Sequence, residues 1–120
     1  MELPKARAVL PQLRFVDSVD STNLSLQRDY ADLPDFSALA AAHQTAGQGR
    51  AGRSWVSEPR SSLSLSVLLR PNRLEISSLI TLLMASSAQQ ALTDLYPSLA
   101  VSIKWPNDLL VEDRKLAVVS

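Results

Sequence analysis

All three glycines of the chain fall within six residues, at positions 47, 49 and 52, inside the segment 44–55 (Gln-Thr-Ala-Gly-Gln-Gly-Arg-Ala-Gly-Arg-Ser-Trp). Glycine allows positive φ and close approach of the backbone to a ligand. Successive backbone N–H groups in such a loop can cradle an anion, and Arg50 and Arg53 add guanidinium donors. The segment is therefore expected to be a ligand-binding loop, with the regular elements arranged before and after it.

Two familiar glycine-rich arrangements do not fit this segment. A dinucleotide-binding loop opens a helix at its glycines, but residues 54–59 end in Pro59 and precede a strand-like run. A kinase loop needs a lysine in the following strand, and residues 62–70 contain none. A flexible surface loop is the other interpretation. Two arginines with Gln44 and Trp55 in twelve positions favour ligand binding instead.

Composition limits the class of protein. The chain has 120 residues, 46% apolar and 20% charged, as expected for a soluble globular domain. Without cysteine there is no disulfide or thiolate metal site, and a net charge of zero gives no general argument for nucleic acid. Residues 76–93 are too rich in Ser, Thr and Gln to span a membrane, and the first fifteen residues are not a signal peptide. We expect a cytoplasmic protein without membrane contact.

Hydrophobic periodicity predicts an α+β fold with a mixed, mostly antiparallel sheet and flanking helices. Helices are expected at 22–33 and 74–96, and strands at 13–19, 39–45, 63–69, 101–105, 108–111 and 116–119. Residues 1–12 are expected to be a loose arm, followed by one domain over 13–120. Residues 112–115 are expected to form a four-residue hairpin loop.

Three further groups of residues have both a structural and a functional interpretation. In Lys-Trp-Pro-Asn-Asp at 104–108, the structural interpretation is a strand end with a proline turn, in which Trp105 is a core residue. The functional one makes Asp108 an oxygen ligand for Mg²⁺ and Lys104 a phosphate partner. Ser-Thr-Asn at 21–23 can cap a helix or hydrogen-bond a neutral polar ligand. Lys115, taken alone, is a solvated hairpin lysine, and His43 is assigned no role.

Taken together, four motifs in this order resemble the catalytic core of biotin protein ligases, the biotin–[acetyl-CoA-carboxylase] ligases. They are Ser-Thr-Asn at 21–23, the glycine loop at 44–55, Lys-Trp-Pro-Asn-Asp-Leu at 104–109 and Arg-Lys-Leu-Ala at 114–117. The resemblance runs from about Phe15 to the C-terminus. It implies the biotin/lipoate protein ligase fold, which is like that of class II aminoacyl-tRNA synthetases.

The resemblance also implies a two-step reaction. Biotin and ATP with Mg²⁺ give biotinyl-5′-adenylate and pyrophosphate, and a lysine of a biotin carboxyl carrier domain of an acyl-CoA carboxylase then attacks the mixed anhydride. Carried over by motif, the biotin-binding residues are Ser21, Thr22, Asn23, Gln44, Gly47 and Gln48. The nucleotide-binding residues are Gly49, Arg50, Arg53, Trp55, Lys104 and Asn107. Lys115 and Arg50 are the implied catalytic residues, with Lys115 foremost, and Asp108 is the implied metal ligand.

This chain departs from the family pattern in two positions and in length. Gln48 stands where the family usually has an arginine, and Val118 stands where it has a glycine. We also expect a chain that is truncated at its C-terminus, without a C-terminal barrel and without a DNA-binding helix-turn-helix. It is therefore expected to be weakly active or inactive alone, with no DNA partner. The exposed edge strand at 116–119 is expected to be able to pair with another chain.

Two alternatives to an active ligase remain at this point. One is a non-catalytic paralogue that binds biotin or the carrier domain. The other is a relative of the lipoate/octanoate transferases, which share the fold. That family does not predict the arginine–glycine loop or the Lys-Trp-Pro-Asn-Asp motif.

Overall fold

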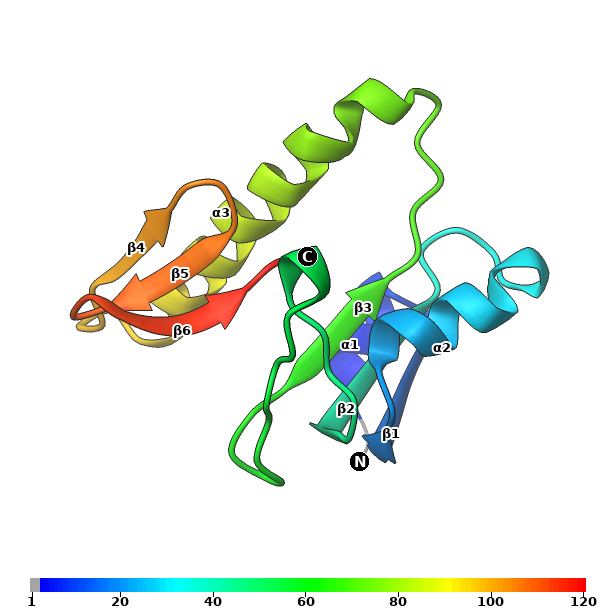
Figure 1. Ribbon diagram of the computed structural model, residues 1–120, viewed down its shortest axis with the longest axis horizontal. Coiled ribbons are helices and arrows are strands. Elements are labelled where there is room, and N and C mark those ends of the chain that lie inside the picture. Colours follow the sequence, from blue (N-terminus) through cyan, green and yellow to red (C-terminus); the bar gives the residue numbers. More distant parts are fainter. Residues whose placement is uncertain (1–2) are drawn as a thin grey trace. The chain divides into compact units, whose positions relative to one another are not determined.

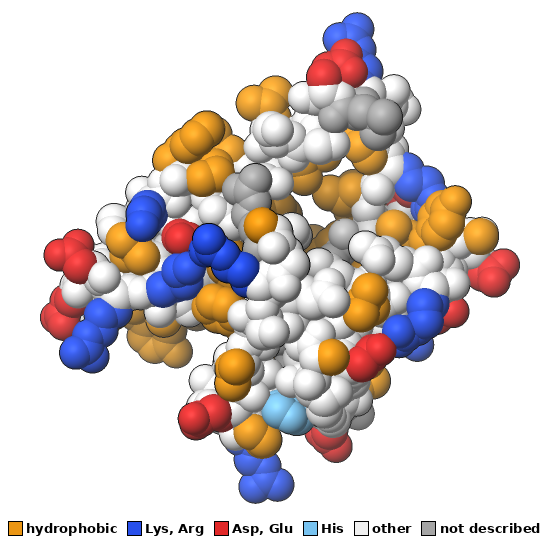
Figure 2. Space-filling model, in the orientation of Figure 1, with side chains coloured by type: hydrophobic (Ala, Val, Ile, Leu, Met, Phe, Trp, Pro, Cys, Tyr) orange, Lys and Arg blue, Asp and Glu red, His pale blue; other side chains and the backbone are white. Residues whose placement is uncertain are grey.

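The computed structural model describes residues 3–120, apart from the side chains of Arg50 and Leu74. The chain forms two compact units, Met1–Arg70 and Pro71–Ser120, and each is described by itself. Charged side chains of both signs appear on the visible face in Figure 2, in keeping with the net charge of zero. Within residues 3–120, no helix combines the length and the apolar character needed to cross a bilayer.

The first unit contains a three-stranded mixed sheet, as Figure 1 shows. Strand β2 (Ala38–Gln44) lies in the centre, parallel to β1 (Leu13–Val19) and antiparallel to β3 (Ser64–Val67). Parallel neighbours need a crossover connection, which helix α2 (Thr22–Asp29) and a 3₁₀ turn (Tyr30–Asp32) supply. The predicted strands and the predicted helix are confirmed, with small shifts at their ends.

The N-terminal residues do not form the loose arm that was expected. Helix α1 spans Pro4–Val9, and Pro4 is tolerated at its start because the first helical N–H groups have no intrahelical partner. Leu3 and Leu10, which flank α1, pack on a core cluster of Leu13, Ala38 and Ala40. This apolar contact anchors the segment 3–10. The prolines, on which the prediction of a loose arm rested, gave no sign of this contact.

The second unit consists of a long helix and an antiparallel sheet. Helix α3 (Ser77–Leu95) follows a 3₁₀ turn (Leu74–Ile76) and packs against the sheet β4–β5–β6 (Val101–Lys104, Asp108–Val111, Arg114–Val118). Ala85 of α3 and Leu109 of β5 are both fully buried. The Gln89 side-chain amide also donates to the Val101 carbonyl, at 2.7 Å.

The β5–β6 hairpin is tighter than predicted. Its loop has two residues, Glu112 and Asp113, with φ of 51° and 61°, as in the two-residue turns that match strand twist. Residues 114 and 115 therefore belong to β6, and the predicted four-residue loop was wrong. The register of β6 against β5 also shifts between Leu109 and Leu110. Leu109 pairs with Ala117, whereas Leu110 pairs with Lys115. Lys115 is thus held on a strand and not on a mobile loop.

Candidate ligand-binding site

The carboxyl ends of β1 and β2 bring the first predicted site residues together. Val19 and Gln44, the last residues of these parallel strands, are register partners. Helix α2 begins at the same edge, where Ser21 caps it by accepting a hydrogen bond from the Leu24 N–H at 3.3 Å. Ligands of sheets with parallel strands commonly bind at this edge. The fold therefore places Ser21, Thr22 and Gln44 where a ligand is expected.

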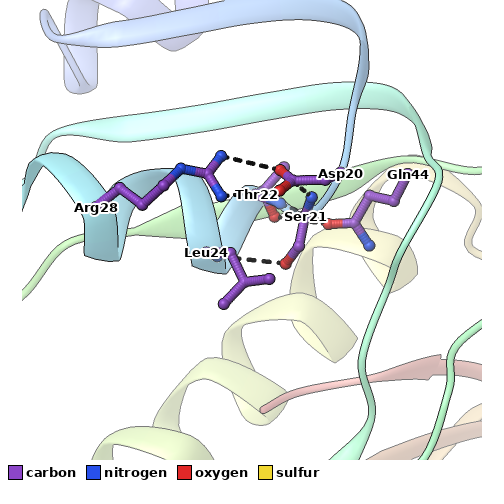
Figure 3. A network of polar contacts seen from close by, with 6 residues as sticks. All are labelled: Asp20, Ser21, Thr22, Leu24, Arg28 and Gln44. Carbon is purple, nitrogen blue, oxygen red and sulfur yellow. Dashed lines mark hydrogen bonds and ion pairs between the residues drawn. The ribbon is translucent and has the colours of Figure 1, made fainter.

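Thr22 fixes the orientation of the Gln44 side chain. Oε1 of Gln44 accepts from the Thr22 backbone N–H at 2.7 Å and lies 3.0 Å from the Thr22 hydroxyl (Figure 3). Thr22 is 3% exposed, so these contacts are largely shielded from water. Among the described residues, the Gln44 Nε2 has no protein acceptor, and Figure 3 shows it pointing away from Thr22. The amide is locked by its oxygen and presents its N–H groups.

Ser66 of β3 joins this cluster and was missed by the sequence reasoning. Its hydroxyl lies 2.7 Å from the Thr22 hydroxyl and also donates to Oδ1 of Asn23. These contacts join Thr22, Ser66 and Asn23 in one polar cluster beside the Gln44 amide. Asn23, predicted to bind biotin, here uses its oxygen within the protein. Only the pairing of β3 with β2 makes Ser66 recognisable among the serines of this segment.

Asp20, which is not among the predicted site residues, stabilises the start of α2. Its carboxylate accepts from the Ser21 N–H at 2.7 Å and forms a bidentate pair with Arg28, at 2.8 and 3.0 Å (Figure 3). The hydrogen bond from Arg28, followed by that from the Ser21 amide, lowers the pKa of Asp20 from 3.8 to about 2. The same partner raises the pKa of Arg28. The backbone oxygen of Asp20 accepts from the Ala46 N–H, which ties the glycine loop to this helix start.

The glycine segment forms a narrow hairpin-like loop. Gly47 and Trp55 are joined by a backbone hydrogen bond of 2.9 Å, Gln48 and Ser54 form an isolated bridge, and the Gly49 N–H donates to the carbonyl of Arg53. The tip is a 3₁₀ turn, Arg50–Gly52. The loop is thus ordered by its own backbone, unlike a flexible surface loop.

The three glycines have different structural reasons. A Cβ on Gly47 would lie 2.6 Å from the Trp55 carbonyl oxygen and 2.9 Å from Nε2 of Gln44, so this position has no room for a side chain. Gly52 has φ of 75°, in the region that glycine favours. A Cβ on Gly49 would meet Arg53 only at ordinary contact distances, of 3.5 Å or more. Close approach therefore matters most at Gly47, beside the Gln44 amide.

The remaining loop residues are less constrained. Gln48 and Arg53 are exposed and Trp55 is partly buried. The Arg50 side chain lies outside what the structure describes. The binding roles predicted for these four residues therefore remain predictions.

In the second unit, strand pairing gathers three predicted residues on one face of the sheet. Lys104 is the register partner of Asp108, and Lys115 pairs with Leu110, two residues along β5 from Asp108. Partners and alternate residues share a face, so Lys104, Asp108 and Lys115 lie together. The Lys115 ammonium lies 3.4 Å from the Asp108 carboxylate, with the two side chains 45% and 15% exposed.

Asn107 and Trp105 are placed differently from one another. Asn107 is 7% exposed, and its amide donates to the Val119 carbonyl at 3.0 Å, so its nitrogen holds the end of β6. Trp105 is 76% exposed and precedes a cis proline, Pro106. The core position considered for Trp105 is therefore wrong.

Asp108 is the carboxylate that the sequence predicts as a ligand for Mg²⁺. Within the described residues there is no cluster of three His, Cys, Asp or Glu side chains that could hold a metal. Mg²⁺ usually keeps several waters and binds one or two carboxylates together with substrate phosphates. A single carboxylate, Asp108, is enough for a Mg²⁺ ion that is bound mainly by substrate phosphates and water. The described residues do not provide a site made of protein ligands alone.

The first unit also contains a hollow of about 150 Å³. It is lined by Pro11, Gln12, Leu13, Arg14, Leu26, Leu33, Ser37 and Ala38. Leu13 and Ala38 are the first residues of β1 and β2, so the hollow is at the opposite end of the parallel pair from Gln44. None of the predicted site residues lines it.

The first unit is a mixed α+β arrangement with polar side chains at the carboxyl ends of its parallel strands. The pattern of the biotin/lipoate A/B protein ligase family matches residues 14–120, and the chain belongs to this family. The bifunctional ligase/repressor BirA of Escherichia coli is 34% identical over 98% of this chain and 38% of that protein. The biotin–[acetyl-CoA-carboxylase] ligase of Mycobacterium tuberculosis is 36% identical over 88% of this chain and 42% of its own length.

Solved structures agree with this assignment. The biotin protein ligase of Aquifex aeolicus, in complex with biotin and ATP, superposes with a TM-score of 0.77 at 34% identity, over 87% of this chain and 43% of that one. The Leishmania major enzyme, in complex with biotinyl-5-AMP, gives 0.72 at 26% identity, over 88% and 49%. The predicted α+β ligase fold is confirmed. The chain spans about two fifths of the length of the curated relatives described above.

Proposed function

We propose that residues 13–120 form the N-terminal part of a biotin protein ligase catalytic domain, and that the cluster at the ends of β1 and β2 binds the head of biotin. The observation that carries this proposal is the locked Gln44 amide. Thr22 holds its oxygen at 2.7 Å, and its Nε2 has no acceptor among the described residues. Family membership supports the same ligand.

The chemistry of the cluster suits the biotin head, which is a neutral cyclic urea with one carbonyl acceptor and two N–H donors. Such a group is recognised by a few well-placed polar atoms and not by charge. Gln44 supplies a donor, and the hydroxyl of Ser21 keeps its proton because its oxygen acts as the helix cap. Gly47, which has no side chain, lets the loop backbone pass close to the Gln44 amide without displacing it.

The reaction we propose has two steps. A carboxylate oxygen of biotin attacks the α-phosphorus of ATP, which forms the mixed anhydride and releases pyrophosphate. The amine of a carrier-domain lysine then attacks the acyl carbon and AMP leaves. No protein nucleophile is required, so positioning and charge neutralisation are the main contributions of the chain.

Lys115 is the residue best suited to the developing charge. Its partner in the structure is Asp108, at 3.4 Å; because the lysine end of the pair is 45% exposed, the pair contributes on the order of 1 kcal/mol. Lys115 can therefore exchange Asp108 for carboxylate and phosphate oxygens at little cost. Bound Mg²⁺ would supply further neutralisation of the phosphates, with Asp108 as its protein ligand. Arg50 and Arg53 are proposed to add donors from the glycine loop.

The other assignments follow the family motifs. Trp55 is proposed to pack near the adenine, and Gly49, Lys104 and Asn107 to lie on the nucleotide side. The acceptor is proposed to be a biotin carboxyl carrier domain of an acyl-CoA carboxylase. In its sheet, β6 pairs with β5 alone among the described strands, so self-association along this edge also stays a proposal.

A second candidate function is biotin or carrier binding without catalysis. It is favoured by Gln48, because the loop then has one cation fewer than the family pattern, which has an arginine at this position. It is also favoured by Val118. Register places Val118 opposite Asp108, on the face that carries Lys115. A branched side chain there narrows the space that a glycine would leave open.

Two measurements on the same protein separate these functions. Calorimetry would measure biotin binding, and biotin-dependent exchange of labelled pyrophosphate into ATP would measure adenylate formation. We expect binding with exchange far below that of a full-length ligase. Exchange at the full-length rate would refute the expectation of weak activity, and absence of biotin binding would refute the proposed function.

A further inference from the structure

Ser57 lies two residues beyond the glycine loop and is bonded to Gln44 in both directions. The Gln44 backbone N–H donates to the Ser57 hydroxyl at 3.1 Å, and this hydroxyl donates to the Gln44 carbonyl at 3.3 Å. Ser57 is 7% exposed. One serine thus satisfies both backbone groups of the residue that ends β2, as an additional strand would do.

This contact closes the base of the glycine loop. Residues 44 and 57 are the outermost pair, followed inward by the backbone bond from Trp55 to Gly47 and by the bridge between Gln48 and Ser54. The inner pairs are held by backbone atoms, whereas the outermost one depends on a side-chain hydroxyl. A change of this single side chain therefore alters the loop at its attachment to the sheet.

We infer that Ser57 is a positioning residue for the biotin head. It fixes the backbone of Gln44, from which the locked amide projects, and so sets the direction of Nε2. The ligand named here rests on the proposed function, whereas the contact between Ser57 and Gln44 does not.

Neighbouring serines provide a matched control. Ser61 is exposed, and its hydroxyl donates to the carbonyl of Glu58 at 3.2 Å, three residues away in the chain. Ser61→Ala removes the same atom from the same segment without touching Gln44. Ser57→Thr keeps the hydroxyl and tests for rescue.

The experiment combines amide hydrogen exchange in the ligand-free protein with calorimetric biotin binding. Loss of a buried hydrogen-bonded contact predicts that Ser57→Ala exchanges the Gln44 and loop amides about tenfold faster and binds biotin about tenfold more weakly. Ser61→Ala should match the wild type in both readouts. Ser57→Thr should stay within about threefold of it.

The outcomes are distinguishable from failure of the proposed function. If the wild type does not bind biotin, the proposed function fails together with the biotin role of Ser57. Amide hydrogen exchange still tests whether Ser57 holds the Gln44 backbone. Unchanged loop exchange in Ser57→Ala, or faster exchange with unchanged biotin affinity, would overturn the positioning role. If Ser57→Ala does not fold, the Gln44 amide of the wild type decides. Protection like that of the inner β2 amides supports the contact, and exchange at the rate of an unstructured amide overturns it.

Discussion

Replacing Gly47 with alanine tests the geometry of the site most sharply, because Gly49 offers a control in the same loop. The new Cβ at position 47 would lie 2.6 Å from the Trp55 carbonyl oxygen and 2.9 Å from Nε2 of Gln44. The Gln44 amide can rotate away, but the Trp55 carbonyl belongs to the backbone. The bond between Gly47 and Trp55 must therefore open or the loop must shift.

The magnitude follows from these contacts. Overpacking of a well-packed site costs about 1–3 kcal/mol, so we expect a loss of about 2 kcal/mol in the stability of the first unit. If displacement of the Gln44 amide costs the same amount, about 2 kcal/mol, in binding free energy, biotin affinity falls about thirtyfold. At Gly49 the nearest atoms are 3.5 Å or more from the new Cβ, and Gly49→Ala should change stability by less than about 0.5 kcal/mol.

The assay uses Trp55 as the reporter. In a Trp105→Phe background, Trp55 is the remaining tryptophan, since the chain has two. Urea unfolding followed by its fluorescence gives the stability of the first unit, and calorimetry gives biotin affinity. Equal midpoints and equal affinities for Gly47→Ala and Gly49→Ala would refute the claim that the loop backbone approaches Gln44 closely.

Four further predictions follow from the charged and edge residues. Because hydrogen bonds from Arg28 and the Ser21 amide lower the pKa of Asp20 from 3.8 to about 2, its stabilisation is present above pH 3.8 and is lost as the pH falls through 2; Asp20→Asn should remove this part of the pH dependence in urea unfolding. Lys115→Gln should weaken binding of a non-hydrolysable biotinyl-adenylate analogue at least tenfold while changing biotin affinity little, as calorimetry would show; equal losses for both ligands would argue against its role at the phosphate. Val118→Gly should tighten binding of the same analogue, and unchanged binding would mean that Val118 does not crowd the site. Light scattering at high concentration should detect self-association through β6, and a monodisperse monomer would count against it.

Much of the fold was predictable because local patterns and tertiary contacts agree. The polar start of α2 and the alternation in β3 each point to one element, and the structure has both. Helix α1 was not predictable, because the leucines that flank it pack on a core that includes Ala38 and Ala40 of strand β2. These residues are distant from α1 in the sequence. The turn at Glu112 and Asp113 was missed because neither residue is a glycine, although both have positive φ.

The predicted site shows the same division. Ser21, Thr22 and Gln44 were found from motif and capping pattern, and the structure brings them together. Ser57 and Ser66 were not found, because each lies in a serine-rich segment where the sequence gives no reason to prefer one hydroxyl. Their burial and their partners are set by the loop and by strand register, which depend on the folded chain.

The central claim is that the cluster at the ends of β1 and β2 recognises a cyclic urea. Its most direct test is calorimetry of the unmodified chain with biotin, dethiobiotin and lipoate, repeated for Gln44→Leu. Dethiobiotin keeps the urea and lacks the sulfur ring, whereas lipoate has a sulfur ring and lacks the urea. We predict binding of biotin and dethiobiotin, no measurable binding of lipoate, and a loss of about tenfold or more in Gln44→Leu. Binding of lipoate as tight as that of biotin, or biotin binding that is unaffected by Gln44→Leu, would contradict this assignment.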